Sequence, residues 1–433
     1  MFRRINKIED KKKGRGKTRR GAWVAQALLA ALIAVAICAG AADLLVPDSI
    51  SAFSDGALPS NPLVGYSYGA GGAAVAASAD AVTAAPTGSG APRRVTVQAK
   101  LFGFLPFKPV EVTVYDDVRL YPGGMTFGIK FHTNGVLVVG VSDIETSAGM
   151  VSPAKDAGIK SGDVITSAGG KRVTAVTDIS SAVEGSQGKP LVINLNRGRQ
   201  KLSVTLAPVL SLTERKYKAG LWLRDSTAGI GTVTFINPVD LQFGGLGHGI
   251  TDVDTGELMP LGSGSVVQIK SGGIVRGRDG SPGELKGSFE GGALGAVTAN
   301  TARGVFGVMD RGWQSLGKPL YQPLPIGLRD TVKTGPATIL CDVDGKGVAE
   351  YSIVIDKIIS KTSESKNFLI KVTDPKLLDL TGGIVQGMSG SPIIQNGHLI
   401  GAVTHVLVSD PTMGYGILIE NMLSAMGEAE GNE

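Results

Sequence analysis

The hexapeptide at 387–392, GMSGSP, sets one serine between glycines in a tight turn and is the strongest chemical signal in the chain. Such a turn leaves the hydroxyl of Ser389 exposed, and the backbone N–H groups around it can converge on one point. A nucleophile beside an oxyanion hole needs this geometry. We therefore predict that Ser389 is a nucleophile and that the amides of Gly387 and Ser389 form the oxyanion hole. Taken alone, the hexapeptide is also compatible with an ordinary surface turn.

A serine hydroxyl at its ordinary pKa is a weak nucleophile, so a general base is required. The sequence contains four histidines. His248 is the best candidate for the base, because four glycines within 244–249 leave its imidazole accessible. The other three are expected elsewhere: His132 on a surface strand, His398 in a hairpin turn and His405 at the end of a strand.

An aspartate that orients the base would complete a catalytic triad. Two aspartates follow His248 closely, two lie farther along the chain, and one lies fifteen residues before Ser389. Spacing alone does not choose among these five residues, which are Asp252, Asp254, Asp310, Asp342 and Asp374.

The charge of the chain is concentrated at one end. Residues 1–20 hold ten Lys and Arg and two acids, so the other 413 residues carry 33 bases and 36 acids, a net charge of −3. This distribution argues against a basic nucleic-acid binder. The two cysteines, Cys38 and Cys341, lie far apart in the sequence and cannot build a metal site. We expect no metal and no organic cofactor.

An apolar run follows the basic tail at 1–20. The segment at 21–42 has Gln26 as its one strongly polar residue, and about 21 residues at about 1.5 Å each span roughly one bilayer core. We predict a transmembrane anchor with a cytoplasmic N-terminus and an exported remainder. A cleaved signal peptide is the alternative, since Ala39-Gly40-Ala41 resembles a cleavage site. We expect a flexible linker at 43–94, where self-cleavage could also occur.

A mainly β architecture is expected beyond the linker. The string at 152–165, SPAKDAGIKSGDVI, resembles the most recognisable stretch of PDZ domains. It includes a short helix after Pro153. We assign 95–208 to a PDZ-like domain with preceding strands. Within it we expect a strand at 110–115, a helix at 176–184 and a peptide-binding carboxylate loop at Phe127, Gly128 and Ile129.

Short apolar segments separated by glycines continue from 209 to 433, as in a β-barrel domain. The hexapeptide at 387–392 resembles the nucleophile loop of trypsin-like serine peptidases. The strand at 399–405 resembles the one that lines their primary specificity pocket. The resemblance implies a peptidase domain at 209–433 with Val403, Thr404 and His405 in the substrate pocket.

From the anchor onward, the chain resembles the stage IV sporulation protein B peptidases of endospore-forming bacteria. In that family the histidine of the G-H-G string, the serine of the G-M-S-G-S-P string and an aspartate fifteen residues before it form the triad. The resemblance therefore implies Ser389, His248 and Asp374. The matching strings are DSTAGIG at 225–231, LGHG at 246–249, GIVQGMSGSP at 383–392 and VTHV at 403–406.

The resemblance also implies a biological setting. A family member crosses the forespore inner membrane and cleaves itself. In the intermembrane space it then cleaves a membrane-bound inhibitor of an intramembrane protease, which activates sigma-factor processing. We further expect the PDZ groove to hold the chain's own N-terminal region before it takes the membrane-bound partner. Two alternatives remain: an envelope quality-control protease of the HtrA type, which would degrade many unfolded proteins, and a PDZ signalling protein without catalysis, which would hydrolyse nothing.

Overall fold

The computed structural model describes residues 93–359 and 364–430 continuously, the short segments 49–54 and 64–68, and single residues between 23 and 58. In this described part, no helix is long and apolar enough to span a membrane. Outside it lie the expected basic tail at 1–20, most of the expected anchor at 21–42 and the glycine- and alanine-rich stretch at 69–92.

The chain forms two compact units, Met1–Asp117 and Val118–Glu433. The first contains a four-stranded sheet in the order β1-β4-β3-β2, with β1 parallel to β4. The expected strand at 110–115 is confirmed as the end of β4, where the buried Val110, Val112 and Val114 alternate with more exposed residues. The strands are β1 (Ser49–Phe53), β2 (Val64–Tyr68), β3 (Arg93–Leu101) and β4 (Leu105–Tyr115).

This small sheet corrects two of the expected boundaries. The segment at 43–94 is not wholly a linker, because β1, β2 and the start of β3 lie in it. The strands at 95–115 belong to the sheet and not to a PDZ domain. The sheet was missed because β1 pairs with residues 111–115, about sixty positions away, and such a long-range pairing leaves no local pattern.

A first six-stranded ring is formed by strands between residues 126 and 309. Its strands follow the order β6-β17-β18-β19-β16-β15, and the pairing of β6 with β15 closes the ring. Phenylalanine, valine and methionine side chains fill its core. The strands are β6 (Thr126–Val141), β15 (Leu221–Ile236), β16 (Gln242–Gly245), β17 (Leu261–Val275), β18 (Glu284–Thr301) and β19 (Gly304–Met309), with β5 (Arg119–Pro122) and β20 (Leu324–Pro325) continuing the sheet beside β15.

A second, closed barrel has the order β21-β22-β23-β26-β25-β24. Two six-stranded rings are the architecture expected of a trypsin-like peptidase, so the β-barrel prediction is confirmed. The elements are β21 (Gly335–Cys341), β22 (Ala349–Ile358), β23 (Phe368–Val372), β24 (Pro392–Gln395), β25 (His398–Leu407) and β26 (Asp410–Leu418), with the helices α4 (Pro375–Thr381) and α5 (Ile419–Glu430) and the short turn η2 (Arg329–Thr331). Another short turn, η1 (Trp313–Leu316), packs against the core of the first ring.

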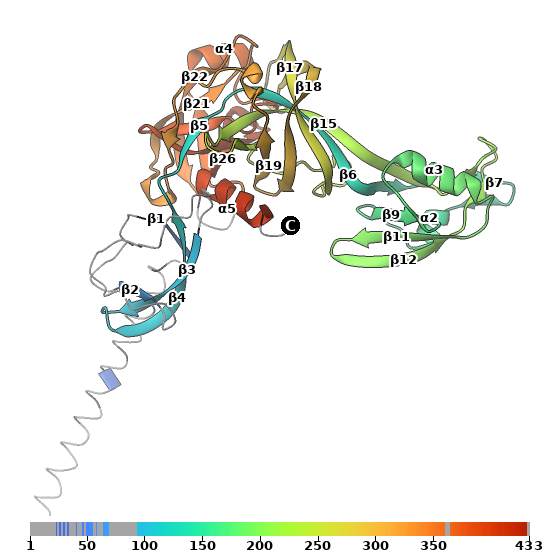
Figure 1. Cartoon of the computed structure of the whole chain (residues 1–433), viewed down its shortest axis with the longest axis horizontal. Helices are drawn as coiled ribbons and strands as arrows, with labels where there is room; N and C mark the ends of the chain where they lie inside the picture. Colours follow the sequence, from blue (N-terminus) through green and yellow to red (C-terminus); the bar gives the residue numbers. More distant parts are fainter. Residues whose placement is uncertain are drawn as a thin grey trace, which may run out of the picture. The chain divides into compact units, whose positions relative to one another are not determined.

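The PDZ module is inserted between β6 and β15, within the first ring. These two strands pair along most of their length, so each has one end in the ring and the other in the module (Figure 1). The helices expected after Pro153 and at 176–184 are confirmed as α2 and α3. The module contains β7 (Ile144–Thr146), β8 (Gly149–Val151), α2 (Pro153–Asp156), β9 (Val164–Ala168), β10 (Lys171–Arg172), α3 (Val176–Gly185), β11 (Leu191–Arg197), β12 (Gln200–Leu206), β13 (Val209–Leu210) and β14 (Tyr217–Lys218).

The expected carboxylate loop at Phe127, Gly128 and Ile129 is wrong. The three residues lie inside β6, where they pair with β15 on one side, and Gly128 and Ile129 also pair with β17 on the other. Phe127 and Ile129 are buried in the core of the first ring. Their backbone is used by the sheet ladder and is not available to a peptide carboxylate.

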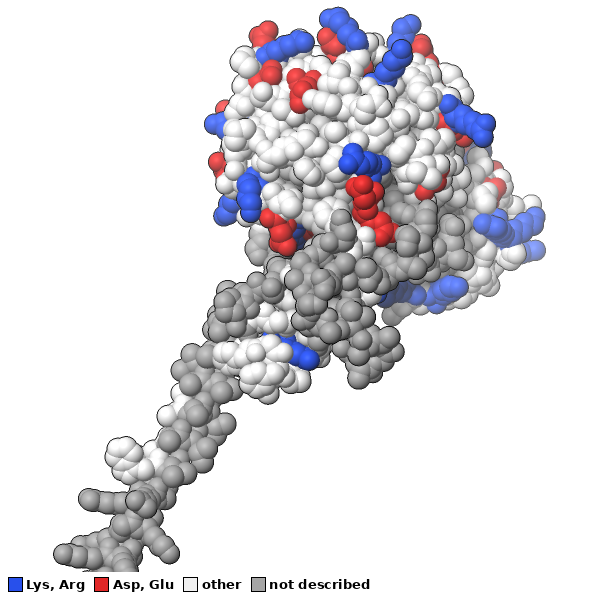
Figure 2. Space-filling view, turned by 60° about the vertical axis from the view of Figure 1, so that its left-hand side comes forward, with Lys and Arg blue, Asp and Glu red and all other residues white. Residues whose placement is uncertain are grey.

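The surface agrees with the charge argument. Figure 2 shows acidic and basic side chains interspersed over the face in view, without a large area of one sign. A mixed surface of this kind does not provide the extended positive field that nucleic-acid binding needs.

The burial of Phe127 in the core of the first ring can be tested by measuring the free energy of unfolding. Phe127→Ala should lower the free energy of unfolding by about 3–5 kcal/mol, because it leaves a cavity in the core of the first ring. Urea denaturation of the full chain measures the change, with His132→Ala as a matched control on an exposed position of the same strand. A Phe127→Ala variant as stable as this control would contradict its place in the core.

Candidate active site

Ser389 lies in a sharp loop just before β24, at the junction of the two rings. Gly387 and Gly390 adopt φ angles of 99° and 96°, which favour glycine. A Cβ atom on Gly390 would lie 2.0 Å from the carbonyl oxygen of Thr232 on β15. The glycines beside Ser389 therefore let the loop of the second ring approach a strand of the first.

Thr232 and Thr234 hold this loop from the other ring. The Thr232 N–H donates to the Ser389 carbonyl (2.9 Å), and its hydroxyl donates to the Gly387 carbonyl (2.7 Å). The Thr234 hydroxyl donates to the Gly390 carbonyl (2.8 Å). Both threonines are fully buried. The sequence analysis missed them, although two threonines at alternate positions in the otherwise apolar segment 228–236 were a visible signal for buried hydrogen bonds.

The amides of Gly387 and Ser389 donate to no other residue of the described chain. The carbonyls of the same two residues point to β15, and the turn is closed by the Ser391 N–H, which donates to the Met388 carbonyl (3.0 Å). The free amides are compatible with an oxyanion hole, whose assignment stays a prediction.

The Ser389 hydroxyl donates to the carbonyl oxygen of Thr404 on β25 at 2.7 Å. The next residue, His405, packs its ring against His248 with 4.8 Å between ring centroids and an angle of 37° between ring planes. Ser389 and His248 therefore lie in one cluster, although no hydrogen bond joins them among the described residues. Catalytic hydrogen bonds are often long in a free enzyme and tighten only with substrate.

The loop that carries His248 follows β16 and is also fixed by close approach. Gly247 has a φ of 67°, and a Cβ atom there would lie 2.8 Å from the Thr404 methyl group and 2.9 Å from a methyl group of Ile417. The glycines around His248 therefore serve packing against the second ring, as well as the access to solvent inferred from the sequence.

The environment of His248 favours the neutral base. Its Nδ1 lies 2.9 Å from the Gly249 carbonyl, and a carbonyl can only accept, so Nδ1 carries the proton. The lone pair of the neutral ring is then on Nε2, as a general base requires. Burial lowers the pKa of His248, against a smaller opposing effect of the Gly249 hydrogen bond. The imidazole is therefore neutral at neutral pH.

Asp374 does not reach His248, which corrects the expected triad. Asp374 is the N-cap of α4: its Oδ1 accepts from the N–H groups of Lys376 (3.0 Å) and Leu377 (3.1 Å). Its Oδ2 accepts from the Ser352 N–H (3.2 Å). An aspartate directly before a proline and a helix is a common cap, and this local role explains its position.

The other aspartates do not supply an orienting carboxylate either. Asp252 is buried and forms an ion pair with Arg224, which also pairs with Asp254 at 2.8 Å. Asp342 accepts from the Gly345 and Gly347 N–H groups in a turn. No carboxylate in the described ranges forms a hydrogen bond or ion pair with His248.

The expected pocket strand is only partly exposed. Val403 is fully buried in the core of the second barrel, so its assignment to the substrate pocket is wrong. The side chain of Thr404 is also buried and donates to the Ser365 carbonyl (3.0 Å). His405 is half-buried beside His248. Of the three predicted residues, His405 alone retains an exposed surface at the site.

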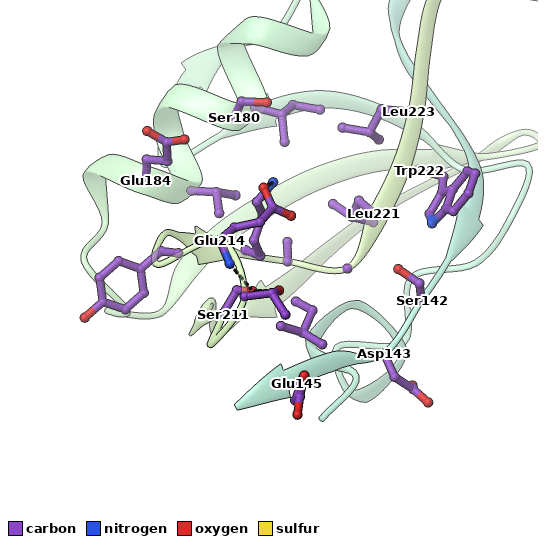
Figure 3. A pocket seen from close by; sticks show the side chains of 18 residues that line it. Ser142, Asp143, Glu145, Ser180, Glu184, Ser211, Glu214, Leu221, Trp222 and Leu223 are labelled. Carbon is purple, nitrogen blue, oxygen red and sulfur yellow. Dashed lines mark hydrogen bonds and ion pairs between the residues drawn. The ribbon is translucent and has the colours of Figure 1, made fainter. Parts of the chain in front are cut away.

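A cavity of about 350 Å³ lies in the PDZ module (Figure 3). Ile179, Ser180 and Val183 of α3 line one side, and Leu221 and Leu223 at the start of β15 line the other. This is the arrangement of a PDZ peptide groove. The string Ala219-Gly220-Leu221 beside it has the apolar-Gly-apolar form that the sequence analysis sought at 127–129. The sequence analysis assigned the carboxylate loop to a string of this form that lies about ninety residues before the one beside the cavity.

The known protein families agree with this geometry. Residues 215–423 match the family described as SpoIVB peptidase S55, and residues 147–197 match a PDZ domain family. Over these residues the chain resembles the S55 serine peptidases, which agrees with the family predicted from the sequence. The S55 match begins before β15 and so includes the strand that lines the PDZ groove. The strands β5 and β6 belong to the same sheet as β15 but precede the matched residues.

Curated relatives share shorter segments with the chain. Serine protease HTRA1 of Xenopus tropicalis is 39% identical over 57 residues, which is 13% of this chain and 12% of the relative. The putative serine protease HhoB of Synechocystis is 37% identical over 86 residues, which is 18% of this chain and 20% of the relative. The chain thus spans a fifth or less of the length of these relatives.

Among solved structures, the active form of the Rv3671c protease of M. tuberculosis is 15% identical, with a TM-score of 0.26. That comparison covers 45% of this chain and 71% of the other.

The role of Asp374 in the S55 domain can be separated from catalysis. Asp374→Asn should preserve the cap, and Asp374→Ala should cost about 0.5–2 kcal/mol of unfolding free energy. Both variants should keep the reaction of Ser389 with a fluorophosphonate, measured as a second-order rate constant. If Asp374→Asn instead lowered that rate by about 10⁴-fold, as expected for a residue that orients the base, the carboxylate would belong to a triad.

Proposed function

We propose that the chain is a serine endopeptidase in which Ser389 attacks the scissile carbonyl carbon and His248 accepts the hydroxyl proton. The observation that carries this proposal is the buried hydrogen-bond set from Thr232 and Thr234, which fixes the Ser389 loop beside the loop of His248. His248 then donates the proton to the leaving amine, and water repeats the sequence on the acyl-enzyme.

Two features of the resting site suit this reaction. The neutral imidazole holds its proton on Nδ1, so Nε2 is free to accept the proton of Ser389. The Ser389 hydroxyl must turn from the Thr404 carbonyl toward Nε2, a rotation about one side-chain bond. The amides of Gly387 and Ser389 would stabilise the oxyanion that follows.

We propose a regulatory substrate in sporulation. The S55 family name and the PDZ module support this setting. The chain would be exported across the forespore inner membrane with its N-terminus cytoplasmic. It would cleave a membrane-bound inhibitor of an intramembrane protease in the intermembrane space. Self-cleavage within 49–94 would release it from the anchor at 21–42.

A quality-control protease is the second candidate, because the curated relatives are serine proteases of the HtrA kind. Degradation of many unfolded proteins by the purified chain would favour it, whereas selective cleavage of one membrane-bound partner would favour the regulatory function.

The PDZ groove would supply selectivity. A peptide in extended conformation would add to the edge of β15 opposite α3, in the cavity lined by Leu221 and Ser180. A tethered ligand acts at roughly millimolar effective concentration, so the chain's own N-terminal region is a suitable first occupant. The membrane-bound partner would then replace it.

If Ser389 and His248 act as one catalytic unit, substitution of either residue should strongly reduce the labelling of Ser389. Ser389→Ala should abolish fluorophosphonate labelling, and His248→Ala should reduce its rate by about 10³-fold or more, because members of one catalytic unit fail together. Rates of labelling of the full chain, with the modified residue located by mass spectrometry, measure both. His398→Ala, at the exposed first position of β25, serves as the control and should label normally. Normal labelling of the Ser389→Ala variant would contradict the assignment.

If peptides bind in this groove, blocking the groove should weaken peptide binding without changing the reactivity of Ser389. Ser180→Trp should fill the groove and weaken binding of an extended peptide by about tenfold or more, while Ser389 still reacts with the fluorophosphonate. Thr177→Trp, an exposed residue of α3 outside the cavity, is the matched control. Fluorescence anisotropy with a labelled peptide from the 49–94 segment measures the binding. Equal affinities of the two variants would exclude this groove as the binding site.

A further inference from the structure

The ring of His405 lies against the imidazole of His248. It packs against His248 with 4.8 Å between centroids. His405 directly follows Thr404, whose carbonyl holds the Ser389 hydroxyl at 2.7 Å. One stretch of two residues on β25 therefore contacts both the nucleophile and the base.

In the described part of the chain, no aspartate orients the His248 ring as one does in the usual triad. The Gly249 carbonyl fixes the proton on Nδ1, but it belongs to the next residue and moves with the same loop. Within the described ranges, neither Asp374 nor Asp252 reaches the ring, since the first caps α4 and the second binds Arg224. A hydrogen bond at one edge leaves the ring free to tilt, so contact with its face is needed to hold the plane.

His405 has the properties of a neutral packing partner. Its Nδ1 is buried and forms no hydrogen bond with any described residue. Burial, together with the smaller effects of His248 and Lys366, lowers the pKa of His405 to about 4. Lys366 lies over the ring of Tyr415, with its Nζ 5.0 Å from the ring centroid. His405 therefore stays neutral when His248 gains a proton during the reaction.

We propose that His405 is a positioning residue of this peptidase, whose ring holds the plane of the His248 imidazole and shields it from water. The inference rests on the proposed function, because it assigns the support of the general base in that reaction. It replaces pocket lining as the principal role of His405. An aromatic face takes the place that an aspartate occupies in the usual triad.

The experiment compares His405→Ala with His405→Phe in the full chain. His405→Phe keeps an aromatic ring and removes both nitrogens, whereas His405→Ala removes the ring. The rate of reaction of Ser389 with a fluorophosphonate is measured across the pH range in which histidine titrates. Thermal unfolding of each variant shows whether it is folded.

The two variants should differ in rate and in pH profile. His405→Ala should react about 10- to 100-fold more slowly at neutral pH, because the base is misplaced. The acidic limb of the pH–rate profile of His405→Ala should shift to higher pH, toward the ordinary histidine pKa of about 6.5, because water reaches His248 and relieves its desolvation. His405→Phe should keep the rate within about threefold of the original and leave the acidic limb in place.

Two results would overturn the inference. An unchanged rate and acidic limb in His405→Ala would show that the ring does not support His248. A folded His405→Phe variant as slow as His405→Ala would show that a nitrogen is needed and not the ring face. If the unmodified chain did not react at all, the proposed function would fail. The inference would then be decided by the NMR titration of His248, whose pKa must still rise in His405→Ala.

Discussion

The hydrogen bonds from Thr232 and Thr234 to the carbonyls around Ser389 are the interaction on which the site depends. They cross from the first ring to the second, and all of their atoms are buried. A buried carbonyl without a donor costs about 1–3 kcal/mol, so the loop has one strongly favoured conformation once the rings meet. The same strand accepts the Leu246 N–H at the Thr232 carbonyl (3.3 Å), close to His248. Strand β15 thus positions the loops of both Ser389 and His248.

The same strand also reaches the PDZ module. Residues 221–223 line the peptide groove, and Thr232 and Thr234 hold the nucleophile loop about ten residues farther along. Pairing with β6 on one side makes this segment a continuous part of the sheet. The insertion of the module into the first ring therefore connects the cavity of the module to the Ser389 loop through one strand, and not through a flexible linker between two domains.

The sequence was most informative where a short string determines its own geometry. The glycines around Ser389 and His248 predicted two tight loops, and the string at 152–165 predicted a PDZ helix and turn, because these features depend on neighbouring residues. Asp374 was misassigned because a cap before a proline and a triad acid look alike in a one-dimensional sequence. Phe127 was misassigned because the apolar-Gly-apolar form also occurs in an ordinary buried strand. The four-stranded sheet and the contact of His405 with His248 depend on the approach of distant segments, which a single sequence does not reveal.

The most direct test of the central claim is the reactivity of Ser389 in Thr232→Val. This change keeps the size of the side chain and removes the hydroxyl that binds the Gly387 carbonyl. If β15 positions the nucleophile loop, the rate of fluorophosphonate labelling should fall by about tenfold or more in a chain that is still folded, and hydrogen exchange should increase in the peptides around Ser389. An unchanged labelling rate and unchanged exchange in this variant would contradict the account.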